Sequence, residues 1–268
     1  MRSAGEDRCR LDPIPRSRVV VLGASNLTHM FRLLVSMLRG VLPGPIDVLA
    51  AIGDGRSYGR KSRFIVRELP GILECGLWPA LEERPRTETR ALIGDLGNDL
   101  VYGAEVGEIA AWIERILARL QDRGATCSLV HLPLENIDRI SNFRFKLARK
   151  VFDPGRKMEL DELRRRAREL DARMVELARA RGVALVPQRG DWYGLDPIHV
   201  LRRNREEALA TWLSPLADHR ADGSPELSHA DRSAMRGLRP QRRRFLGRLQ
   251  VRDQPCARLL DGTTISVY

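Results

Sequence analysis

A serine, an aspartate and a histidine in this sequence have the types and settings needed for acyl transfer. Ser25 stands between an apolar run and a helical pattern, where a helix N-terminus stabilises negative charge. Asp196 and His199 are two residues apart, so the carboxylate can accept from one imidazole nitrogen while the other faces a nucleophile. Each feature has an ordinary alternative, since Ser25 could be a helix N-cap and an Asp-x-x-His spacing is common.

Two further positions could stabilise negative charge on a substrate. Gly53 lies in a turn after the second apolar run, where the absence of a Cβ lets the backbone approach a ligand closely. Asn98 follows the third run, and its amide can donate to a developing oxyanion. A tight turn at Gly53 and an Asx-turn at Asn98 are equally compatible with the residues alone.

Five short apolar runs must position these residues. They alternate with helical patterns such as residues 105–122 and 160–177, which is typical of parallel strands covered by helices on both faces. This predicts a three-layer, doubly wound α/β fold with a mainly parallel five-stranded sheet, whose ligand sites lie at the carboxyl ends of the strands. The predicted strands are residues 18–22, 46–50, 90–93, 127–132 and 183–187.

The order serine, glycine, asparagine and Asp-x-x-His resembles the four sequence blocks of the SGNH hydrolase superfamily, the GDSL-type lipases and esterases. The likeness covers roughly residues 18–216. It implies a flavodoxin-like SGNH domain that hydrolyses carboxylic esters through an acyl-enzyme, without a metal or cofactor. It also implies that Ser25 is the nucleophile, His199 its base and Asp196 the orienting acid. The oxyanion hole would comprise the N–H groups of Ser25 and Gly53 with the Asn98 amide.

The blocks depart from the family pattern at three positions. The first block usually reads Gly-Asp-Ser, whereas Ala24 precedes the serine here and Asn26 follows it. The third block usually has a glycine two residues before the asparagine, where this chain has Leu96. These differences indicate a divergent member, with a catalytically silent binding or scaffold protein as the alternative.

A cluster of carboxylates offers a rival chemistry. Asp54, Asp95, Asp99 and Glu135 each follow a predicted strand, and together they could hold Mg²⁺ for phosphoryl transfer. The glycines and lysine of residues 55–61 lack phosphate-loop spacing, however. An esterase without a metal is therefore favoured.

Composition restricts the class of protein. A chain of 268 residues is long enough for one substantial core, and its apolar runs are far shorter than the roughly 20 residues of a membrane span. The charged first 17 residues lack the apolar segment of a secretory signal, so we expect a cytoplasmic protein. The four cysteines, at positions 9, 75, 127 and 256, are too scattered for a metal motif and are expected to be free thiols.

The net charge of +11 allows association with nucleic acid. Four of the 46 basic residues are lysines and the other 42 are arginines, while aromatic residues, the material for base stacking, are only 5% of the chain. A small-molecule ester is therefore the favoured partner, and nucleic acid a less favoured one.

The sequence divides into three parts: an N-terminal segment (1–17), the SGNH-like domain (18–217), and a basic linker with a C-terminal extension (218–268). Within the domain, residues 133–157 are long for a connection and form a candidate lid above the strand ends.

Overall fold

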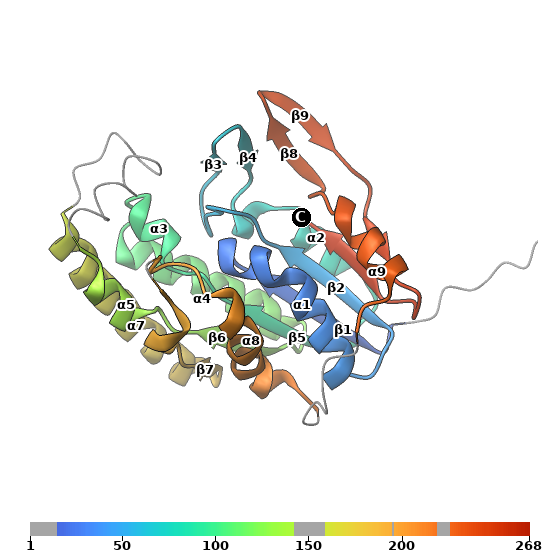
Figure 1. Cartoon of the computed structure of the whole chain (residues 1–268), viewed down its shortest axis with the longest axis horizontal. Coiled ribbons are helices and arrows are strands. Elements are labelled where there is room, and N and C mark those ends of the chain that lie inside the picture. Colours follow the sequence, from blue (N-terminus) through green and yellow to red (C-terminus); the bar gives the residue numbers. More distant parts are fainter. Residues whose placement is uncertain (1–14, 142–158, 195, 219–225) are drawn as a thin grey trace, which may run out of the picture.

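The computed structural model describes residues 15–141, 159–194, 196–218 and 226–268. Its centre is a seven-stranded sheet in the order β10-β11-β2-β1-β5-β6-β7, with helices on both faces (Figure 1). All neighbouring strands are parallel except β10, which runs antiparallel to β11. The strands are β1 (Ser17–Leu22), β2 (Ile46–Ala51), β5 (Glu88–Ile93), β6 (Thr126–Val130), β7 (Ala184–Val186), β10 (Ala257–Arg258) and β11 (Thr264–Val267). The predicted α/β class and its five parallel strands are confirmed.

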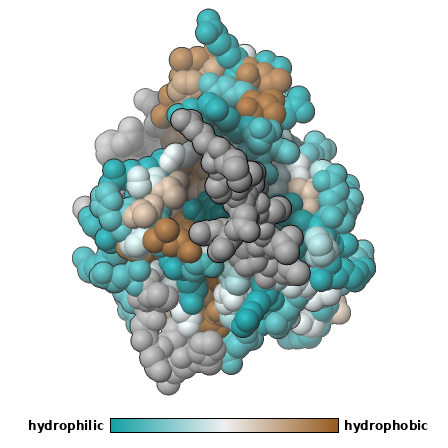
Figure 2. All heavy atoms as spheres, turned by 90° about the vertical axis from the view of Figure 1, so that its right-hand side faces the viewer, coloured by the Kyte–Doolittle hydropathy of each residue, from teal (hydrophilic) through white to brown (hydrophobic). Residues whose placement is uncertain are grey.

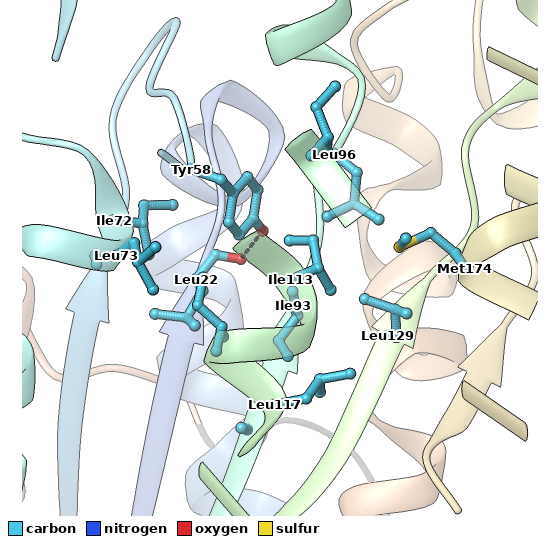
Figure 3. Close-up of a cluster of buried hydrophobic side chains, with 14 of the residues drawn as sticks. Leu22, Tyr58, Ile72, Leu73, Ile93, Leu96, Ile113, Leu117, Leu129 and Met174 are labelled. Carbon is cyan, nitrogen blue, oxygen red and sulfur yellow. Dashed lines mark hydrogen bonds between the residues drawn. The ribbon is translucent and has the colours of Figure 1, made fainter. Parts of the chain in front are cut away.

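Alternation along β1 divides the core into two layers. Val20 and Leu22 face a cluster that includes residues of α2, α4 and α7 (Figure 3), whereas Val19 and Val21 face a cluster with α1 and α8. A strand covered on both faces is apolar throughout, which is why these runs were recognisable in the sequence. The helices are α1 (Ser25–Val41), α2 (Leu77–Glu83), α3 (Asn98–Val101), α4 (Val106–Asp122), α5 (Leu134–Arg139), α7 (Leu160–Arg181), α8 (Arg205–Leu213) and α9 (His229–Ala234). Short 3₁₀ turns occupy Ile72–Glu74, Gly190–Trp192, Arg202–Asn204, Ser214–Leu216 and Met235–Gly237.

A second, antiparallel sheet projects from the body in the order β3-β4-β8-β9 (Figure 1), and we call it the arm. Its strands are β3 (Ser62–Phe64), β4 (Arg67–Leu69), β8 (Arg242–Phe245) and β9 (Arg248–Val251). The arm joins a hairpin inserted between β2 and β5 to a hairpin near the C-terminus. Strands β3 and β4 have three residues each, too few for an alternating pattern to reveal them in the sequence.

The C-terminal extension is built into both sheets. It supplies β8 and β9 to the arm, and then β10 and β11 to the edge of the central sheet beside β2. Residues 249–251 and 264–268 alternate in the sequence as short strands do, but the alternation does not indicate their partners. The proposed boundary at residue 217 thus marks where the β-α alternation ends in the sequence, while the later strands return to the same sheet.

A buried charge network ties three neighbouring strands together. The Asp47 Oδ2 atom of β2 accepts hydrogen bonds from the Nε atoms of Arg18 on β1, at 2.9 Å, and Arg84, at 3.0 Å. Its Oδ1 atom accepts from the Thr264 hydroxyl of β11 at 3.1 Å. A buried carboxylate needs such partners, because taking an unpaired charge out of water is costly.

Across the described ranges, no helix is long and apolar enough to cross a membrane. Cys75 and Cys127 are buried free thiols and Cys256 is a half-buried one, as expected, whereas Cys9 lies outside the described residues.

Candidate active site

Ser25 lies at the turn from β1 to α1, as predicted, but it does not cap the helix. The N-cap is Ala24, and Ser25 is the first helical residue. Its Oγ atom lies 2.9 Å from the Nε2 atom of His199. This hydrogen bond replaces the capping contact expected under the alternative interpretation.

His199 is in turn held by Asp196, as the spacing predicted. Its Nδ1 atom lies 2.7 Å from Asp196 Oδ2, while Asp196 Oδ1 accepts from the backbone N–H groups of Ile198, at 2.9 Å, and His199, at 3.3 Å. The carboxylate therefore closes its own turn and orients the ring with its other oxygen. The structure brings Ser25, His199 and Asp196 into one hydrogen-bonded chain.

The same contacts shift both pKa values in opposite directions. The hydrogen bond to Asp196 raises the pKa of His199 above 6.5 against the opposing effect of burial, and the charges of Asp196, Asp95 and Asp54 add to the rise. Burial alone would raise the pKa of Asp196, but hydrogen bonds from His199 and the Ile198 N–H outweigh it and lower that pKa. The aspartate is thus kept ionised beside an imidazole that binds a proton readily.

Asp95, which follows β5, holds the turn that carries Ser25 through hydrogen bonds to its backbone. Its Oδ2 atom accepts from the N–H groups of Ala24 (2.8 Å) and Leu27 (3.2 Å), so it supplies from another strand the capping that Ala24 cannot. Its backbone has φ 59°, an uncommon conformation for a residue other than glycine. The sequence suggested Asp95 only as a possible metal ligand.

Asn26, a departure from the family pattern, holds the loop that carries His199 against the turn that carries Ser25. Its Nδ2 atom donates to Asp95 Oδ1 and to the Ile198 carbonyl, both at 2.9 Å. Its Oδ1 atom accepts from the Val200 N–H at 2.9 Å. Asn26 therefore bonds to both neighbours of His199, a role that no sequence spacing could indicate.

Asn98 presents an amide donor beside the serine. It is the first residue of α3 and lines the same pocket as Ser25 and His199. Its Nδ2 atom is buried and has no hydrogen-bond partner among the described residues. An unsatisfied buried donor is costly, so it gains most when an acceptor enters the pocket.

Gly53 begins the turn that borders this pocket. The next two residues, Asp54 and Gly55, line the pocket, whereas Gly53 is buried behind them. A Cβ built on Gly53 would lie 2.5 Å from the Leu69 Cδ1 atom, so a larger residue would disturb the base of the arm. Its participation in an oxyanion hole stays a prediction.

The pocket is a cavity of about 100 Å³ lined by Ser25 and His199 on one side and by Phe64 of the arm on another. Its walls include the apolar side chains of Phe64, Val101, Tyr102 and Ile198. His29 also lines it, with its ring centroid 5.1 Å from that of His199. His29 lies four residues after Ser25, which places both on the same face of α1.

Tyr58 links the ends of β1 and β5 through hydrogen bonds from its hydroxyl group. Its hydroxyl lies 3.1 Å from the carbonyl oxygen of Leu22, at the end of β1 (Figure 3), and 2.5 Å from that of Gly94, after β5. The adjacent Asp99 accepts from the Ser57 hydroxyl and from the Tyr58 N–H. Burial raises the pKa of Asp99 to about 6 despite these hydrogen bonds.

The rival magnesium site does not form within the part of the chain that the structure describes, where no three histidine, cysteine, aspartate or glutamate side chains gather as metal ligands. Asp95 and Asp99 instead accept the hydrogen bonds described above.

Of the candidate lid, residues 142–157 lie outside the described residues.

No family model matches the sequence, and no curated protein does. Among solved structures, a carbohydrate acetylesterase family member from Sinorhizobium meliloti is 15% identical, with a TM-score of 0.52 over 75% of this chain and 96% of that one. The native M. smegmatis aryl esterase is 11% identical, with a TM-score of 0.50 over 74% of this chain and 98% of that one. At such identities the likeness concerns the fold alone: this chain shares the α/β fold of these two esterases.

Proposed function

We propose that this protein is a serine-dependent hydrolase of carboxylic esters that acts through an acyl-enzyme. The observation that carries the proposal is the hydrogen-bonded chain from Ser25 Oγ through His199 to Asp196, with distances of 2.9 and 2.7 Å. Its order is that of a nucleophile, a general base and an orienting acid. The chain opens into a pocket rather than lying in the core.

In the first half-reaction, the Ser25 oxygen attacks the ester carbonyl carbon while His199 Nε2 takes the hydroxyl proton. A serine hydroxyl is hardly ionised near neutral pH, so this transfer is needed for attack. The carbon–oxygen bond to the alcohol then breaks, and His199 gives its proton to the leaving alkoxide. Asp196 stabilises the transient imidazolium throughout and keeps its own charge.

In the second half-reaction, water replaces the alcohol. His199 removes a proton from the water as the water attacks the acyl carbon, and returns a proton to Ser25 Oγ as that bond breaks. The products are the free carboxylic acid and the original enzyme. His199 serves both steps because its Nε2 atom already faces the serine oxygen.

Both tetrahedral intermediates place negative charge on the former carbonyl oxygen. The Asn98 amide, which has no partner among the described residues, is the proposed donor to this oxygen, together with the N–H groups of Ser25 and Gly53. The apolar walls from Phe64, Val101 and Tyr102 suit the hydrocarbon part of an acyl group.

Hydrolysis of p-nitrophenyl acetate by the wild type and Ser25→Ala tests this proposal. We expect turnover by the wild type and a loss of at least about 10³-fold in kcat for the variant, because no other group replaces the nucleophile. Ser214→Ala, which changes an exposed serine outside the pocket, is the matched control. Equal turnover by the wild type and Ser25→Ala would refute the mechanism.

A further inference from the structure

The two turns at the end of the arm lie side by side and carry apolar residues. Ile65 and Val66 connect β3 to β4, while Leu246 and Gly247 connect β8 to β9. The Leu246 N–H donates to the Val66 carbonyl at 3.0 Å, which fixes one turn against the other. The arm therefore ends in a single surface formed by both hairpins.

The residues at these turns are apolar but exposed to water, and their backbone conformation is unfavourable for their side chains. Ile65 is 72% exposed and Leu246 is 67% exposed. Both have positive φ angles, 55° and 50°, in the left-handed region that asparagine and glycine tolerate and that bulky residues avoid. Leu249 and Val251 on β9 are also exposed, which extends the apolar surface along one edge of the arm. Neither the exposure of these apolar side chains nor the left-handed backbone of Ile65 and Leu246 stabilises the isolated protein.

Arginines surround this apolar surface. Residues 62–69 and 242–251 contain six arginines and a single carboxylate, Glu68. Arg63, Arg242, Arg244 and Arg248 are exposed. Figure 2 shows the hydrophobic side chains gathered at the upper end of the molecule, where the arm lies, with hydrophilic ones beside them.

We propose that the end of the arm docks on an anionic lipid surface. Apolar side chains at a turn can enter the boundary between headgroups and acyl chains, while neighbouring guanidinium groups bind lipid phosphates. Charge complementarity selects this partner, since the four exposed arginines can face an anionic surface favourably and the exposed apolar side chains gain an apolar environment. A neutral surface would use only the second of these contributions.

The arm also borders the active site. Phe64 precedes Ile65 directly and lines the pocket, and the Arg67 Nη2 atom lies 3.2 Å from the Asp54 carbonyl oxygen and 3.4 Å from Asp54 Oδ2. Docking would thus hold the pocket next to the lipid surface. The lipid contact itself does not depend on ester hydrolysis, and it is measured without any substrate.

Sedimentation with vesicles tests the apolar part of the proposal. Vesicles of mixed phosphatidylcholine and phosphatidylglycerol should sediment together with the wild type. The partition coefficient of the double variant Ile65→Asn/Leu246→Asn onto these vesicles should be at least about tenfold lower. Asparagine suits the left-handed turns, so this variant should melt at the wild-type temperature or higher. The matched control is Leu260→Asn, because Leu260 is 75% exposed at the turn between β10 and β11, outside the arm.

A second pair of variants tests the charges. Arg242→Gln/Arg248→Gln should weaken sedimentation with the mixed vesicles, whereas Arg173→Gln/Arg179→Gln, which removes two exposed charges from α7 away from the arm (Figure 1), should change it little. Binding should fall with added salt and be weaker on pure phosphatidylcholine.

Three results would overturn the proposal: wild-type protein left in the supernatant, unchanged sedimentation of Ile65→Asn/Leu246→Asn, or equal binding to charged and neutral vesicles. A dimer in solution that this variant dissociates, with no vesicle binding, would instead assign the surface to a second copy of the chain.

Discussion

Asn98 offers the most direct residue-scale test of how the pocket treats negative charge. Its buried amide is without a partner in the described structure, so Asn98→Ala removes a donor that is free to bond an acceptor in the pocket. We expect kcat for p-nitrophenyl acetate to fall about 10²–10³-fold while the melting temperature is kept or raised. Full turnover by this variant would remove Asn98 from the proposed oxyanion hole.

Asn26 is expected to act through His199 rather than on the substrate. Asn26→Ala would leave the Ile198 carbonyl and the Val200 N–H without their side-chain partner, so the loop that carries His199 would lose its position. We expect kcat to fall at least about tenfold with little change in KM, and stability to fall by about 1–3 kcal/mol.

The comparison with Asn204→Ala separates these effects of Asn26. Asn204 also donates to a backbone carbonyl, that of Asp191, but it lies outside the pocket and should leave kcat unchanged. If Asn26→Ala lowered stability alone and left kcat intact, its positioning role would be wrong.

The pKa of His199 determines the direction of the pH dependence. The base must be unprotonated to accept the serine proton, and Asp196 raises its pKa above 6.5, so kcat/KM should increase with pH and reach half its maximum above 6.5. Asp196→Asn removes the hydrogen-bonded charge and should move that midpoint downward while lowering the maximal rate. A pH-rate profile of both proteins measures the shift, and a midpoint unmoved by the substitution would contradict this assignment of Asp196.

The contacts among Ser25, His199 and Asp196 could be anticipated from the sequence, but the residues that support them could not. Ser25, Asn98, Asp196 and His199 each follow a strand or turn in a recognisable order. The capping role of Asp95 was not visible in the sequence, because the N–H groups that it accepts from lie 68 and 71 positions away. Its place after a strand suggested only a metal ligand. Such a role depends on β5 lying beside β1, which local spacing does not encode.

At the scale of elements, the site exists because three parallel strands end together. Leu22 at the end of β1 is in register with Ala51 of β2 and Ile93 of β5. These strands are followed by the turn that carries Ser25, the Gly53 turn and the segment of Asp95 and Asn98. Apolar strands were visible in the sequence because both their faces are buried, and their order then followed from the α/β class.

The buried network around Asp47 should contribute strongly to the stability of the central sheet. Asp47→Ala would leave Arg18, whose side chain is only 4% exposed, without its charge partner, and Arg84 with one contact fewer. We expect the free energy of unfolding to fall by about 3–5 kcal/mol in urea titrations.

Asp161→Ala is the control for Asp47. Its carboxylate pairs with Arg164 but is 91% exposed, so its loss should cost less than about 1 kcal/mol. Equal effects of the two substitutions would show that the Asp47 network contributes no more than a surface ion pair.

At the scale of the whole molecule, the C-terminal segment completes both sheets. Ile265 and Val267 on β11 are buried in the core cluster that also contains residues of α1 and α8. The sequence indicated a strand here, but it could not show that β11 pairs with β2, which lies more than 200 residues earlier. Long-range pairing of short strands is set by the tertiary fold, so the arm and the sheet edge were the parts least accessible to sequence patterns.

The central claim is that Ser25 is a nucleophile activated within this fold. Incubation with a fluorophosphonate, followed by intact-mass and peptide mass spectrometry, tests it independently of the natural substrate. The account predicts one adduct on Ser25, absent from Ser25→Ala and strongly slowed in His199→Ala. An unlabelled wild type, or an adduct on another residue that persists in Ser25→Ala, would contradict it.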